Sequence, residues 1–169
     1  MKGNVDVDEY VVDGYEEEKP GRSYHSAKKK VVCAVELTNQ GKAKRFYTFK
    51  IPDYSAKSLR KMLEKHIDID AKITTDKWKG YNPIAKDYDL TQILSDKGSD
   101  FKALHIMIHQ VKSWIRTTYS WVSESNIDRY FDEFCYRINR SQSKDTIFNN
   151  LIKRMVKSEN ITHKEITCN

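Results

Sequence analysis

The chain has 169 residues, with 30 Lys and Arg against 24 Asp and Glu, which gives a formal net charge of +6. Its hydrophobic fraction of 38% includes 10 Tyr, 6 Phe and 3 Trp, enough large side chains to fill a core and exclude a wholly disordered chain. No apolar run is long enough for a transmembrane helix, and the first residues lack the apolar core of a signal peptide. We therefore expect one globular domain of ordinary size, cytoplasmic or nucleoid-associated, with no membrane partner.

The first half of the chain predicts strands. Apolar and polar residues alternate over residues 4–12 and 43–51, and residues 31–37 form a short apolar run of strand length. Short turns between such runs favour an antiparallel meander. The charged segment at residues 15–30, with its Pro-Gly pair, predicts a loop or a hairpin excursion.

The second half of the chain shifts toward helical periodicity, with apolar residues spaced by three and four. Ser55 is suited to cap the first helix, and the spacing of Ser125 and Asp128 resembles a capping box for a later one. The element order predicts an α/β fold, a mixed five-stranded sheet flanked by helices, with its first three strands antiparallel and further helices at the C-terminus. The remaining predicted elements are a helix at residues 55–67, strands at 71–75 and 90–94, helices at 104–116, after Ser125 and at 145–156, and a frayed polar tail from 157.

Cysteine and histidine spacing gives little support for a zinc site. Cys33, Cys135 and Cys168 form no CxxC pair, so neither a zinc knuckle nor a disulfide framework is predicted. Cys33 lies in an apolar run and is expected to be buried. His105 and His109 have the i and i+4 spacing that could hold one metal ion, but no carboxylate or cysteine lies close to them in the sequence, and a solvated pair is the plainer interpretation.

Two acidic residues lie in or beside predicted strands. Asp8 lies within the first strand, and Asp76 follows the strand predicted at residues 71–75. If these strands are neighbours, the two carboxylates converge, and they repel each other unless a cation lies between them. Mg²⁺ accepts such a pair, with water and phosphate completing its octahedron. The alternative is that both are ordinary solvated residues near strand ends.

Several sequence blocks in the same order resemble bacterial insertion-sequence transposases of the DDE type, which have a ribonuclease H-like catalytic domain. The resemblance covers about residues 5–140 and is closest to a branch that often has Asn, two positions before a Lys, in place of the third acidic residue. At those positions this chain has Gln110 and Lys112. The matching blocks are Val7-Asp8-Glu9-Tyr10 with Gly14, Thr75-Asp76-Lys77-Trp78-Lys79-Gly80-Tyr81, Pro52-Asp53-Tyr54-Ser55-Ala56, His105, Val111-Lys112-Ser113-Trp114-Ile115, and residues 119–140.

The resemblance implies DNA strand cleavage and strand transfer with two Mg²⁺ ions, or Mn²⁺ in their place. Asp8 and Asp76 would be carboxylate ligands and Gln110 a weaker third ligand. Lys112 would hold a substrate phosphate. Glu9 is adjacent to Asp8 but points to the other face of the strand, so we expect it to lie outside the metal site.

The implied partner is DNA, both transposon ends and target, bound by a homo-oligomer when the protein is active. Residues 1–140 would form the catalytic domain, and residues 141–169 a C-terminal helix and tail. The chain is expected to lack the DNA-recognition region that usually precedes this domain. The residues expected to contact DNA are Lys77, Lys79, Lys112 and Arg116.

Departures from the family pattern leave two alternatives open. The Gln110 amide brings no charge to a metal, and Thr117 replaces a family Gly at a position where a positive φ would be costly. The first alternative is therefore an inactive, truncated transposase remnant that binds nucleic acid without sequence preference. The second is a protein-interaction module built on the terminal helices, whose apolar stripes more often form core.

Overall fold

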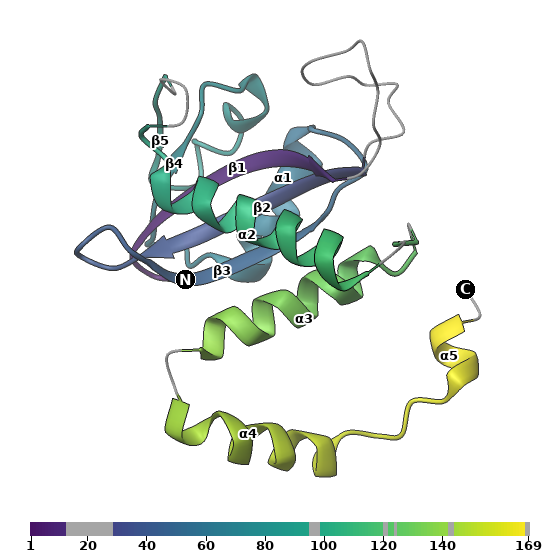
Figure 1. Cartoon of the computed structure of the whole chain (residues 1–169). Helices are drawn as coiled ribbons and strands as arrows, with labels where there is room; N and C mark the ends of the chain where they lie inside the picture. The colour runs from purple at the N-terminus through teal and green to yellow at the C-terminus, as the bar shows by residue number, and fades with distance from the viewer. Residues whose placement is uncertain (13–28, 95–98, 120–121, 124, 142–143, 168–169) are drawn as a thin grey trace.

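The structure is a computed structural model and describes residues 1–12, 29–94, 99–119, 122–123, 125–141 and 144–167. It contains one sheet with the strand order β3-β2-β1-β4-β5 (Figure 1). The first three strands pair antiparallel, and β4 and β5 are added in parallel, so the predicted α/β class, a mixed five-stranded sheet flanked by helices, is confirmed. The loop predicted at residues 15–30 lies for the most part outside the described residues. The strands are β1 (Asn4–Val12), β2 (Lys29–Leu37), β3 (Ala43–Lys50), β4 (Lys72–Thr75) and β5 (Leu90–Gln92).

Helices cover both faces of the sheet and give two separate hydrophobic layers. Alternate residues of β1 enter different layers, Val5 and Val7 on one face and Tyr10 and Val12 on the other. The first layer contains α1 (Ala56–His66) and η1 (Lys79–Tyr81), and the second contains α2 (Lys102–Thr118) and α3 (Ile127–Arg140). By the same alternation, Asp8 faces the α2 side of β1 and Glu9 faces the α1 side.

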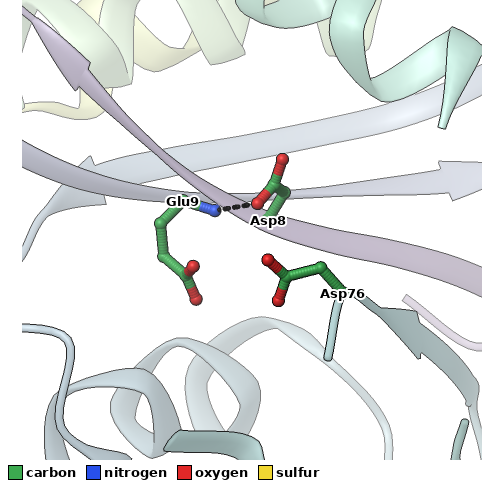
Figure 2. Close-up of side chains that lie close together, drawn as sticks. All are labelled: Asp8, Glu9 and Asp76. Carbon is green, nitrogen blue, oxygen red and sulfur yellow. Dashed lines mark hydrogen bonds between the residues drawn. The ribbon is translucent and has the colours of Figure 1, made fainter. Parts of the chain in front are cut away.

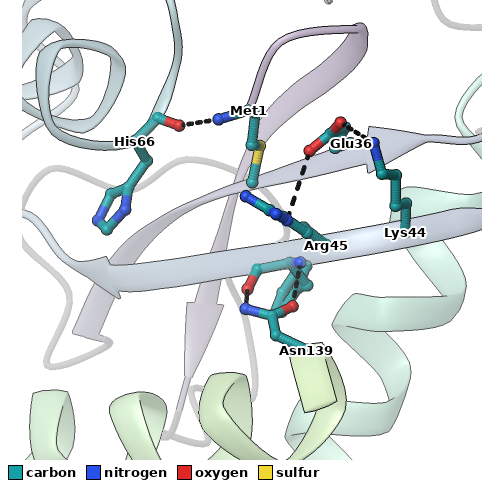
Figure 3. A network of polar contacts seen from close by, with 7 residues as sticks. Met1, Glu36, Lys44, Arg45, His66 and Asn139 are labelled. Atoms are coloured by element: carbon teal, nitrogen blue, oxygen red, sulfur yellow. Dashed lines mark hydrogen bonds and ion pairs between the residues drawn. The ribbon is translucent and has the colours of Figure 1, made fainter. Parts of the chain in front are cut away.

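Side chains near both ends of α3 attach it to β3. The predicted capping box of Ser125 and Asp128 is wrong, because Asp128 Oδ1 accepts a hydrogen bond from Lys50 N at 2.7 Å instead. Near the other end, Asn139 Oδ1 accepts from Phe46 N at 2.7 Å and Asn139 Nδ2 donates to Phe46 O at 2.9 Å (Figure 3). The apolar stripe of α3 packs into the core, as expected. Its buried members are Ile127, Phe131, Phe134 and Cys135.

The C-terminal helix α4 (Lys144–Lys157) lies outside the two core layers. It forms where a helix was predicted, yet none of its residues is buried. α5 (His163–Thr167) forms within the segment predicted to be a polar tail. α2 continues through Thr117, whose hydroxyl donates to Ser113 O at 3.0 Å, so the helix extends beyond its predicted end. Among the described residues, no helix has both the length and the apolar character needed to cross a bilayer.

Candidate active site

The first carboxylate of the site is fixed by the middle of the sheet. Asp8 lies on β1 opposite Cys33 of β2, and the buried Cys33 thiol donates to Asp8 O at 3.4 Å. One carboxylate oxygen, Asp8 Oδ1, accepts a hydrogen bond from Glu9 N at 2.8 Å (Figure 2). The side chain is 19% exposed, so it is accessible from solvent while its backbone is held by the central strands.

The second carboxylate lies at the end of the neighbouring strand. β4 runs parallel to β1 with Thr75 opposite Val7, which places Asp76 next to Asp8 at the point where the chain leaves the sheet. Trp78 N donates to Asp76 Oδ1 at 2.9 Å, and Gln92 Nε2 on β5 donates to Trp78 O at 2.9 Å. The loop after β4 is therefore tied both to its own carboxylate and to the adjacent strand.

Trp78 and Gly80 make this loop compact. Trp78 Nε1 donates to Tyr54 O at 3.0 Å, and Trp78 packs beside the core layer of α1. A Cβ on Gly80 would lie 2.6 Å from Trp78 Nε1 and 2.8 Å from Tyr54 O, so no larger residue fits without displacing the loop. The side chains of Lys77 and Lys79, on either side of the tryptophan, are exposed.

A third carboxylate joins the first two. One ligand atom from each of Asp8, Glu9 and Asp76 lies within 4.8 Å of the other two (Figure 2). Figure 2 shows Asp8 and Glu9 leaving β1 in opposite directions with Asp76 beside them. The expectation that Glu9 faces the other side of the strand holds. Its exclusion from the site does not follow, because its longer side chain reaches the sheet edge where Asp76 lies.

Glu9 is the most enclosed member of the cluster. It is buried, and the hydroxyl of the fully buried Tyr81 in η1 donates a hydrogen bond to Glu9 Oε1. Burial and the nearby Glu9 carboxylate raise the pKa of Tyr81 well above its ordinary value, so this hydroxyl stays protonated and remains a donor. Three neighbouring carboxylates form an all-oxygen donor set that suits a hard divalent cation.

The helix α2 brings a histidine to the cluster. His105 Nε2 lies 3.6 Å from Asp8 Oδ2. Gln110, the predicted third ligand, is exposed and lies five residues further along α2. Five residues correspond to a rotation of about 140° from His105 and a displacement of about 7.5 Å along the axis. Helix geometry therefore favours His105 over Gln110 as the residue that faces the carboxylates.

A basic stripe continues along the same face of α2. Lys112 and Arg116 fall within about 20° of His105 on the helix, two and three turns further on. Lys112 is half-buried, with its Nζ 5.2 Å from the centre of the Tyr10 ring. Burial and the neighbouring Arg116 lower the pKa of Lys112. Because Tyr10 follows Asp8 on the same face of β1, the stripe runs along this strand away from the carboxylates.

Comparison with known proteins gives one informative match. The sequence profile of the ISXO2-like transposase domain matches residues 1–139. A similar solved structure is the Mos1 transposase paired-end complex with left transposon end, at 12% sequence identity and a TM-score of 0.30. That match covers 84% of this chain and 55% of the other. No curated protein matches the chain.

Proposed function

Because the chain belongs to the family of ISXO2-like transposase domains, we propose that it cleaves and joins DNA strands as the catalytic domain of an insertion-sequence transposase. The observation that carries this proposal is the group formed by Asp8, Glu9 and Asp76, whose ligand atoms lie within 4.8 Å of one another. Repulsion between like charges at this spacing destabilises the metal-free protein and favours a bound divalent cation. A group of ordinary solvated surface residues does not account for this arrangement.

The residues of the cluster fit two divalent cations. Bound Mg²⁺ or Mn²⁺ would activate a water molecule or a 3′ hydroxyl for in-line attack on phosphorus and stabilise the leaving oxygen. Asp8, Glu9 and Asp76 would hold the ions, with the strands fixing their positions before substrate arrives. Lys112 would place its ammonium group on a phosphate oxygen of the substrate, and its partial burial limits the conformations it can adopt.

The DNA backbone would follow the basic residues on both sides of the carboxylates. Lys77 and Lys79 lie in the loop after β4, and Lys112 and Arg116 lie on α2. Contacts of this kind are made to phosphates, so we expect affinity to fall steeply with salt and to show little sequence preference. Lys112→Ala should reduce the slope of log affinity against log salt by about one.

The same proposal extends to organisation and location. Residues 1–140 would be the catalytic unit, and residues 141–169 would be an appended helix and tail. The active form would be a homo-oligomer that synapses two DNA ends, acting in the cytoplasm on nucleoid DNA.

A strand-cleavage assay tests the proposal. The purified chain is incubated with labelled duplex oligonucleotides and a nicked plasmid target, with Mg²⁺, with Mn²⁺ or with EDTA. We expect metal-dependent nicking or joining that Asp76→Asn abolishes. Asp70→Asn, which removes an exposed charge just before β4, serves as the control and should keep full activity. Activity retained in Asp76→Asn or in EDTA would contradict the proposal.

One observation favours a second candidate. α2 contains no Asp or Glu, so it offers the metal site no carboxylate of its own. The chain would then be an inactive remnant that binds nucleic acid through the basic stripe alone. Salt-sensitive DNA binding with no cleavage under any metal condition, and no metal binding at Asp76, would identify this case.

A further inference from the structure

The residue that α2 turns toward the carboxylates is a histidine, and this has a consequence for the choice of metal. We propose that His105 Nε2 is a nitrogen ligand of the ion bound at Asp8, and that it shifts the preference of the site from Mg²⁺ toward a transition ion such as Mn²⁺. This inference rests on the proposed function, since it concerns the ion which that function requires.

The separation of the two groups fits a shared ion better than a hydrogen bond. His105 Nε2 and Asp8 Oδ2 are 3.6 Å apart, which exceeds the usual length of a hydrogen bond. Two ligands at about 2.1 Å from one octahedral ion lie about 3.0 Å apart when adjacent and about 4.2 Å apart when opposite. The observed distance of 3.6 Å exceeds the adjacent spacing by about 0.6 Å, so the two atoms become adjacent ligands of one ion after a small side-chain movement.

The two oxygens of Asp8 have different surroundings. Oδ1 accepts a hydrogen bond from Glu9 N at 2.8 Å, while Oδ2 is the oxygen close to His105. The Asp8 carboxylate thus connects the cluster it shares with Glu9 and Asp76 to the histidine on α2. A carboxylate that bridges two ions about 3.5 to 4 Å apart is the usual arrangement of a two-metal site.

Both supports of the pair are rigid. Asp8 lies in the interior of β1, which is hydrogen-bonded to a strand on each side. His105 lies near the start of α2, next to Leu104, which is fully buried. Two ligands held by a central strand and a packed helix keep their spacing without a bound ion, and such preorganisation favours tight binding.

Ligand type decides selectivity. Mg²⁺ strongly prefers oxygen donors and gives up its waters reluctantly, whereas imidazole suits first-row transition ions. Mn²⁺ resembles Mg²⁺ in accepting carboxylates and water but also tolerates nitrogen. An imidazole ligand at this position therefore weakens the binding of Mg²⁺ more than the binding of Mn²⁺.

Metal titration gives the first test. Mn²⁺ binding is followed by the loss of the free-ion EPR signal, and Mg²⁺ by competition, for the wild type, His105→Gln, His105→Glu and His109→Gln. We expect His105→Gln to weaken Mn²⁺ binding about tenfold or more and to change Mg²⁺ binding little. His105→Glu should move the preference back toward Mg²⁺. His109→Gln removes a histidine one turn away on the same helix and should leave both affinities unchanged.

Pulsed EPR of the Mn²⁺-loaded wild type gives a test that needs no variant. Directly bound imidazole nitrogen produces a characteristic electron spin-echo modulation, which we expect in the wild type and in His109→Gln but not in His105→Gln. Mn²⁺ that binds without this modulation, or a modulation lost in His109→Gln, overturns the inference and leaves the carboxylate site standing. Absence of any Mn²⁺ binding to the wild type, or binding unaffected by Asp76→Asn, overturns the proposed function itself.

Discussion

Removing one charge from the carboxylate cluster should stabilise the metal-free protein. Asp76→Asn keeps the shape of the side chain, and the amide oxygen can still accept the hydrogen bond from Trp78 N that measures 2.9 Å. What disappears is the repulsion between Asp76 and the carboxylates of Asp8 and Glu9, whose ligand atoms lie within 4.8 Å. Substitution of a residue that served only the fold would instead destabilise the protein.

The magnitude follows from Coulomb's law. Two unit charges 4.8 Å apart repel by about 0.9 kcal/mol at the dielectric constant of water and by about 3.5 kcal/mol at an effective constant of 20. Asp76 is only partly buried, so the lower figure applies to each neighbour, and the variant should gain about 1 to 2 kcal/mol. This gain corresponds to a rise in melting temperature of about 3 to 6 °C for a domain of this size.

Thermal unfolding in EDTA and in divalent metal measures the effect. In EDTA the variant should melt above the wild type. With metal at about one hundred times its dissociation constant, the wild type should gain about 2.7 kcal/mol and overtake the variant, which has lost a ligand. Asp70→Asn controls for a general change in net charge and should leave the melting temperature unchanged, both in EDTA and in divalent metal. A variant less stable than the wild type in EDTA, or equal metal stabilisation of both proteins, would refute the reasoning.

Three further predictions concern the fold. Burial lowers the pKa of His66 from 6.5 to about 4, so the folded state resists protonation of this residue. The free energy of unfolding should therefore fall by up to about 3 kcal/mol as the pH drops from 6.5 to about 4. In denaturant titrations of His66→Gln, the free energy of unfolding should depend less on pH. Asn139→Ala leaves both backbone groups of Phe46 without their side-chain partner and should cost about 1 to 3 kcal/mol in urea unfolding, whereas an unchanged midpoint would mean that these bonds contribute nothing net. Deleting residues 144–169 should change the stability of the rest by less than about 0.5 kcal/mol, because α4 has no buried residue; loss of cooperative melting would show that α4 supports the core.

The sheet could be predicted from the sequence where its strands are long. Alternation over residues 4–12 and 43–51, with the apolar run between them, predicts the antiparallel meander that forms β1, β2 and β3. β4 and β5 span only four and three residues, too few for periodicity to define their ends or their partners. The spacing did not predict the parallel pairing of β1 with β4, which brings Asp8 and Asp76 together. The expectation that these two residues share one metal site came from the family resemblance.

Tertiary partners explain the errors at the helices. Asp128 has the spacing of a capping residue, but its carboxylate accepts a hydrogen bond from the backbone amide of Lys50 on β3, and this contact between elements replaces the local one. The stripe on α4 has the same periodicity as those on α2 and α3, yet no layer of the sheet remains for it to cover. Periodicity indicates that a helix has an apolar face, and it does not tell whether the fold supplies a surface for that face.

Helix periodicity separates two of the predicted site residues on α2. On a helix each residue advances by about 100°, so Gln110 and Lys112 lie about 160° apart and cannot both face one substrate. His105 and Lys112 are seven residues apart, which is almost two full turns, and they share a face to within about 20°. Any residue of α2 that works with Lys112 must therefore lie on the same face of the helix, as His105 does at 3.6 Å from Asp8. Because an isolated histidine gives no sign that a carboxylate will pack against it, the strand that supplies Asp8 had to be placed before His105 could be connected with it.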